Sequence, residues 1–188
     1  MGKIKRWRMG LLALASALLM ACQTTPLAPQ QQLQLGLGVS QTAQVTHAQT
    51  LLQQALDGFT QAQDVQGQAK TAFALGELYK STRWQETLQP PATLESYQKS
   101  SDYFEQAALL YTQLGQPLVA GSAYVGAANA ALLADRLPQA CDYHRQALQL
   151  AQEFDADQDD NAKAQLQKNL TFFADLTVVC LAQSSSPD

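Results

Sequence analysis

Residues 100–108 read Ser-Ser-Asp-Tyr-Phe-Glu-Gln-Ala-Ala, and the spacing within this stretch decides the fold. A small residue is followed four positions later by a bulky one, and three positions after that by alanine. The same spacing recurs at 48–56 and at 140–148. An alanine at a helix crossing lets two helix axes approach to about 8 Å, while the bulky residue one turn away fills the neighbouring groove. The pattern therefore predicts an all-α protein built from packed antiparallel helix pairs.

Proline and glycine mark the ends of the predicted helices. Gly115-Gln116-Pro117 separates two of them, Pro90-Pro91 ends one and begins the next, and Pro138 suits the first turn of another. We expect the last helix to close the exposed face of the array as a C-terminal cap. The predicted helices span 44–62, 66–88, 92–114, 118–135, 138–154 and 160–182.

Two further segments resemble those of a known family. Leu75-Gly76-x2-Tyr79, and more weakly Ala127-Ala128-x2-Ala131, precede two of the spaced stretches. Together they resemble the tetratricopeptide repeat (TPR), whose first helix carries Leu-Gly-x2-Tyr. The stretches lie 52 and 40 residues apart, so they resemble elongated variants of this repeat. The resemblance covers 44–182 and implies a short right-handed α-solenoid of antiparallel helix pairs; a generic helical bundle with Ala-rich seams is the alternative.

The resemblance also implies a binding surface. In the family, the first helix of each repeat lines a concave groove that holds peptide segments or partner helices. Asn129 matches a position where the family often uses asparagine to bind a ligand's backbone, but the earlier repeat has Glu77 there, so a two-asparagine clamp is incomplete. For each groove residue, plain solvated surface is the alternative. The groove residues carried over by position are Lys70, Phe73, Glu77, Lys80, Ser122, Val125, Asn129 and Leu132.

The N-terminus has the character of a bacterial export signal. Residues 1–10 are basic, and the apolar run at 11–20 is too short to span a bilayer, as in a signal peptide. The following Ala21-Cys22 resembles a lipobox, which implies cleavage of a signal peptide at 1–21 and lipidation of Cys22. In the lipoproteins that carry this box, a residue other than Asp after the cysteine, here Gln23, implies sorting to the outer membrane. The inner membrane is the alternative. An ordinary buried cysteine in an N-terminal helix is the other interpretation of Cys22.

A tether is predicted between the lipidated cysteine and the helical domain. Residues 23–43 contain no charged residue, two prolines and two glycines, and they show no helical stripe or cap. We therefore predict a flexible tether over 22–43, with an extra strand or helix at 33–39 as the alternative. At the other end of the chain, we predict a disordered tail at 183–188.

Charge excludes one class of function. Four of the 12 cations lie within the first eight residues, which leaves eight cations against 16 anions, a net charge of −8, in the remainder. A chain this acidic lacks the broad basic surface that sequence-independent nucleic-acid binding requires. We therefore expect no nucleic-acid partner.

Few residues suggest chemistry at a site. A calcium loop requires Gly at its sixth position and Glu at its twelfth, but counting from Asp155 these positions hold Asp160 and Leu166. The acidic cluster at 153–160 therefore indicates a turn between helices, followed by a helix with negative charge at its N-terminus. Cys141 and His144 share a helical turn, but two ligands do not make a metal site. The sequence shows no Ser-His-Asp order, phosphate loop or paired-Glu motif. We expect no enzyme, no metal and no cofactor apart from the lipid on Cys22.

Two thiols remain once Cys22 is lipidated. Cys141 opens one predicted helix and Cys180 closes the next, so an antiparallel pair places both at the same end. In the expected register of the two helices, Cys180 lies about 7 Å along the helix axis from the position opposite Cys141, at about 1.5 Å per residue. A disulfide between them therefore needs a modest tilt of one helix against the other or a longer turn. In an oxidising compartment we favour a disulfide slightly over two reduced, buried thiols.

One aromatic residue has two interpretations. Trp84 and Leu88 are expected in an extended arm of the 66–88 helix, facing Leu94 and Tyr97 across the Pro90-Pro91 turn. Alternatively, Trp84 is an exposed contact for a partner, since tryptophan is enriched at binding hot spots.

The functional expectation follows from the anchor and the predicted groove. It is a lipid-anchored scaffold or adaptor on the periplasmic face of the outer membrane, serving the assembly of an envelope complex. The alternatives are a regulator of a cell-wall enzyme and an enzyme with an unrecognised site. We infer a protein partner, and no small-molecule substrate.

Overall fold

A computed structural model describes residues 27–87 and 92–153, together with residues 161, 164, 167, 168, 170, 171 and 180. The predicted signal peptide, Cys22 and the C-terminal tail lie outside the described residues, as does most of the acidic cluster. Every regular element in the described part of the chain is an α-helix, which confirms the all-α prediction. The helices are α2 (Pro29–Ser40), α3 (Val45–Gln61), α4 (Val65–Lys80), α5 (Thr82–Gln85), α6 (Ala92–Gln113), α7 (Pro117–Leu133) and α8 (Leu137–Glu153).

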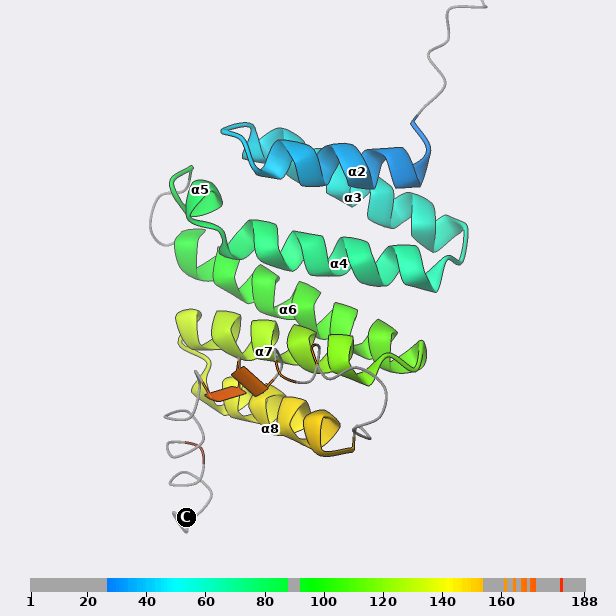
Figure 1. The fold of residues 1–188 in the computed structure, drawn as a ribbon. Helices are drawn as coiled ribbons and strands as arrows, with labels where there is room; N and C mark the ends of the chain where they lie inside the picture. The colour runs from blue at the N-terminus through cyan, green and yellow to red at the C-terminus, as the bar shows by residue number, and fades with distance from the viewer. Residues whose placement is uncertain are drawn as a thin grey trace, which may run out of the picture.

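The long helices pack mainly on their neighbours in sequence. Contacts join α2 to α3, α3 to α4, α4 to α6, α6 to α7 and α7 to α8, so α2 and α8 lie at opposite ends of the stack (Figure 1). All nine positions of the small–bulky–Ala spacing are buried, among them Ser100, Phe104 and Ala107. The spacing that predicts the helices therefore marks the contacts between them. No described helix combines the length and the apolar composition needed to cross a membrane.

The ring of Phe104 occupies the centre of the stack. Its side chain is 0% exposed and packs edge-to-face on Phe73, with ring centroids 5.2 Å apart. A Cβ atom added to Gly76 of α4 would lie 2.8 Å from this ring, and one added to Gly126 of α7 would lie 2.9 Å from it. Two glycines on different helices thus make room for a single phenylalanine on α6.

Buried serines hold α6 against the helices on either side of it. Ser96 Oγ donates to the carbonyl of Tyr79 at 2.9 Å, and Ser100 Oγ donates to that of Gly76 at 2.7 Å. Ser101 Oγ donates in the opposite direction, to the carbonyl of Ala127 at 3.2 Å. Small side chains permit the close approach, and each hydroxyl keeps a partner once it is buried.

The flexible tether predicted over 22–43 is wrong for residues 29–40, which form α2. Pro29 begins the helix, and the amide of Ala28 donates to Gln31 Oε1 at 3.2 Å. Leu33 is buried, and a Cβ atom on Gly36 would lie 2.8 Å from Leu52 of α3. The helix given as the alternative at 33–39 is therefore present, and it is longer than predicted because a glycine, ordinarily a helix breaker, is accommodated on its buried face.

The predicted 66–88 helix is also too long, because α4 ends at Lys80. Ser81 adopts an extended backbone, donates from Oγ to the carbonyl of Leu78 at 2.7 Å, and accepts from the amide of Trp84 at 3.2 Å. One serine therefore closes α4 and caps α5.

Trp84 belongs to the core. Its indole is 8% exposed and lies edge-to-face on Tyr79, with ring centroids 5.0 Å apart. Leu94 is 43% exposed, and the predicted contact of Trp84 with Leu94 and Tyr97 stays a prediction. Leu88 lies outside the described residues. The buried position favours the packing role of Trp84 over the exposed partner contact.

Two described residues join the predicted C-terminal cap to the core. Leu170 is buried in the same cluster as α6, α7 and α8, and Cys180 packs against that cluster. Cys141 and Cys180 form a disulfide with their Cα atoms 5.5 Å apart. This is the pairing that the sequence favours slightly over free thiols.

Candidate binding groove

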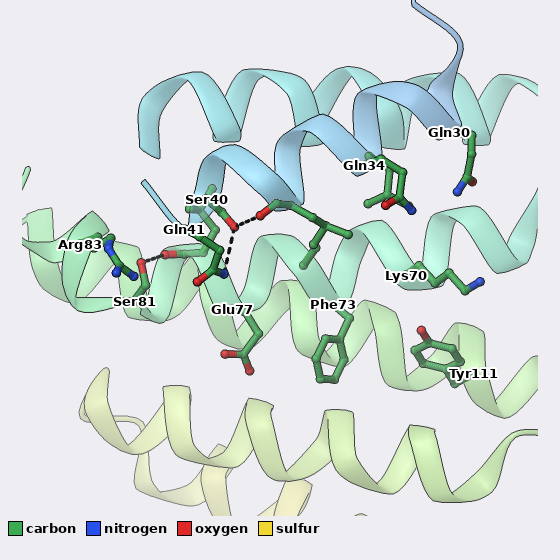
Figure 2. A pocket seen from close by; sticks show the side chains of 14 residues that line it. Gln30, Gln34, Ser40, Gln41, Lys70, Phe73, Glu77, Ser81, Arg83 and Tyr111 are labelled. Carbon is green, nitrogen blue, oxygen red and sulfur yellow. Dashed lines mark hydrogen bonds between the residues drawn. The ribbon is translucent and has the colours of Figure 1, made fainter. Parts of the chain in front are cut away.

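A groove of about 590 Å³ lies between α2 and α4, and its ends are completed by α5 and α6 (Figure 2). The two helices run in the same direction along it: Gln30 lies near Lys70 at one end, and Gln41 lies near Ser81 at the other. The lining residues are Gln30, Leu33, Gln34, Leu37, Ser40, Gln41, Lys70, Phe73, Ala74, Glu77, Leu78, Ser81, Arg83 and Tyr111.

The middle of the groove is apolar. Leu33, Phe73 and Leu78 form part of its lining, and Phe73 is fixed in place by its contact with the Phe104 ring. Leu37 also lines the groove, yet it remains 41% exposed. Exposed apolar surface within a concave site is typical of a site that buries an apolar group of a ligand.

The rim of the groove is polar. Gln30, Gln34 and Gln41 contribute side-chain amides, which both donate and accept hydrogen bonds. At one end, burial raises the pKa of the Tyr111 phenol, which therefore stays protonated and able to donate at neutral pH.

Two cations line the groove at its ends. Lys70 and Arg83 are both lining residues, and neither forms an ion pair with another residue that the structure describes. Glu77 is the only acidic residue in the lining, and its carboxylate lies 3.2 Å from Lys80 Nζ. That ammonium also lies 5.0 Å above the Phe104 ring. Glu77 is thus already compensated, which leaves the groove with excess positive charge.

The first predicted groove set agrees well with this site. Lys70, Phe73 and Glu77 line the groove, and Lys80 flanks it through its ion pair with Glu77. The helical register of α4 brings these side chains to one face. The same register explains why the sequence could place them together.

The second predicted set, on α7, does not line this groove. Val125 is wrong as an exposed groove residue, since it is 6% exposed within the core. Leu132 packs against the same core, and Ser122 Oγ donates back to the carbonyl of Leu118 at 3.0 Å. Asn129 is half-buried. The physical reason is that α7 has no charged residue and lies between α6 and α8, so apolar neighbours cover most of its surface.

None of the α2 residues that line the groove was predicted as a groove residue, although a helix at 33–39 was the alternative to the tether. Gln30, Gln34, Leu37 and Gln41 lie on one helical face, and their spacing of three, four and seven residues was the available signal. Arg83 was missed for another reason. Its position depends on the break at Ser81, which the sequence does not reveal.

Other polar clusters have structural roles. Tyr143 donates to Glu105 Oε2 at 2.7 Å and accepts from Gln139 at 2.6 Å, which joins α8 to α6. Burial, followed by the hydrogen bond to Glu105, raises the pKa of Tyr143. Burial lowers the pKa of His144. Among the described residues, no three His, Cys, Asp or Glu side chains gather as metal ligands, and the Cys141 sulfur is bonded to Cys180.

Comparison with known proteins adds no assignment. No protein-family model matches the chain, and a search of the curated proteins finds no match.

Proposed function

We propose that this protein is a lipid-anchored scaffold or adaptor that binds a protein partner in the α2–α4 groove. Its proposed location is the periplasmic face of the outer membrane, where it would serve the assembly or upkeep of an envelope complex. The observation that carries the proposal is the groove lining. Exposed Leu37 lies beside an apolar floor, and the rim holds amides and two cations that form no ion pair with a described residue. Such a combination suits a peptide segment, whose backbone and side chains need both kinds of contact.

A TPR-like solenoid is the proposed arrangement of the helices. Its support is the packing of each long helix mainly on its sequence neighbours, together with the burial of Gly76 and Tyr79 from the Leu-Gly-x2-Tyr segment. In such an array, the first helices of successive pairs form a concave face. The parallel course of α2 and α4 along the groove fits that arrangement (Figure 2).

The anchor is proposed from the basic start, the short apolar run and Ala21-Cys22. The proposed connection between Cys22 and the helices is short, because α2 begins at Pro29 rather than beyond residue 43. Seven residue steps span at most about 25 Å of extended chain. The groove is therefore expected close to the membrane surface, where an envelope partner is also held.

Photo-cross-linking in cells tests the groove. A photoreactive amino acid replaces Leu37, which is 41% exposed in the groove, or Leu109, which is 56% exposed on α6 and outside the lining. We expect a discrete protein adduct from position 37 and none of the same mass from position 109. Equal adducts from both positions, or none from position 37, would contradict the proposal.

A second arm of this experiment tests the anchor separately. The Cys22→Ser variant should remain unprocessed and take up no radioactive palmitate, because acylation requires the thiol. Labelling that continues in this variant would sink the assignment of Cys22. The matched control is Cys141→Ala with Cys180→Ala, which should still be labelled.

A further inference from the structure

The cations of the groove differ from three described cations on or beside α6 and α8, which form ion pairs. Lys99, Arg136 and Arg145 each lie within 2.9–3.5 Å of a carboxylate oxygen on α6 or α8. Lys70 and Arg83 line a concave surface and have no such partner among the described residues. Beyond residue 8, the chain has eight cations against 16 anions and is therefore acidic. Two cations in one groove give this groove a positive charge, opposite in sign to the net charge of the rest of the chain.

Their separation sets a length for the ligand. Lys70 and Arg83 lie at opposite ends of the groove (Figure 2). From Lys70 to Lys80, the last residue of α4, the ten helical steps rise about 15 Å, and Arg83 lies beyond this end. An extended chain advances about 3.3 Å per residue, so five or six residues cover this distance.

The rim favours an extended ligand over a helical one. Gln30, Gln34 and Gln41 offer amide groups along the α2 wall. These amides can bond the free N–H and C=O groups of an extended backbone. A helical ligand has already paired most of those groups internally.

We propose that the groove selects an extended segment of the partner protein that carries two acidic side chains five or six residues apart, with apolar side chains between them. The acidic groups contact Lys70 and Arg83, and the apolar groups pack against Leu37 and Phe73. This inference rests on the proposed function and names the chemistry of the segment that is bound.

Fluorescence anisotropy with a defined peptide tests the inference. The probe is a fluorophore-labelled, C-terminally amidated Glu-Ala-Leu-Ala-Leu-Ala-Glu peptide, titrated with the purified full-length protein. The matched probe replaces both glutamates with glutamine, and a third places the two glutamates side by side. We expect the first probe to bind about tenfold more tightly than either control, and this preference to shrink with added salt. Equal affinity for the three probes, or no binding of the first, would overturn the inference.

Protein variants locate the contacts. Lys70→Gln with Arg83→Gln should remove the preference for the glutamate probe, while Lys99→Gln with Arg145→Gln, which removes two cations outside the groove, should preserve it. Circular dichroism checks that both double variants are folded. If the groove variant keeps the preference, the acids bind elsewhere and the inference is wrong. A cross-link from position 37 without any preference for acidic probes would refute this inference and leave the proposed function standing.

Discussion

Phe104→Ala is expected to lower the free energy of unfolding by about 3–5 kcal/mol, the range for truncating a buried aromatic side chain. The ring is fully buried, and Gly76 and Gly126 have no side chains with which to fill the space left behind. The cavity would therefore persist, which places the expected loss toward the upper part of that range. Urea unfolding followed by circular dichroism measures it.

Two controls make this prediction specific. Leu109→Ala changes an exposed residue on the same helix and should alter stability by no more than about 0.5 kcal/mol. Gly76→Ala should destabilise the wild-type protein through overpacking, and should destabilise the Phe104→Ala variant much less, because the ring it meets is gone. A loss below about 1 kcal/mol for Phe104→Ala would mean that the ring does not occupy this position.

Loss of the Cys141–Cys180 disulfide is expected to lower stability by about 4 kcal/mol, because a bridge across 39 positions restricts the unfolded chain. The variant Cys141→Ala with Cys180→Ala measures this in the same unfolding experiment. The bridge fastens the C-terminal part of the chain to α8, so its loss should weaken that end of the stack first.

Reductant provides the control for the disulfide. Adding it should destabilise the wild-type protein and leave the double variant unchanged. Peptide mapping after alkylation, with the protein unfolded but not reduced, should find neither Cys141 nor Cys180 modified. Modification of both residues would show that no bridge forms.

The sequence predicts the described helices from α3 to α8 well, apart from α5 and the end of α4, because their contacts rely on local spacing. Ser100, Phe104 and Ala107 lie on one helical face whatever packs there, so the pattern alone identifies that face as buried. Pro117 and Pro138 limit the helix ends to within a few residues. Ser81 has no such signature, because serine is also tolerated within helices. Its capping of α5 emerges only from the fold.

The groove could be predicted only in part for a similar reason. Lys70, Phe73 and Glu77 share the face that the register of α4 defines. The burial of Val125, in contrast, depends on what α6 and α8 place around α7. The α2 wall depends on Gly36, which acts as a contact with Leu52 rather than as a break in the helix. The role of Gly36 depends on the side chains of α3, and the sequence around Gly36 does not predict which helix packs there.

The groove exists only if α2 is docked on α3, and amide hydrogen exchange of residues 33–40 measures that docking most directly. These amides are bonded within a helix whose Leu33 and Gly36 are buried. We predict that they exchange orders of magnitude more slowly than an unstructured chain, and that Gly36→Glu, which cannot fit against Leu52, abolishes this protection while α6 and α7 remain protected. Exchange of residues 33–40 at the rate of an unstructured chain in the wild-type protein would contradict the groove, and the proposed partner site with it.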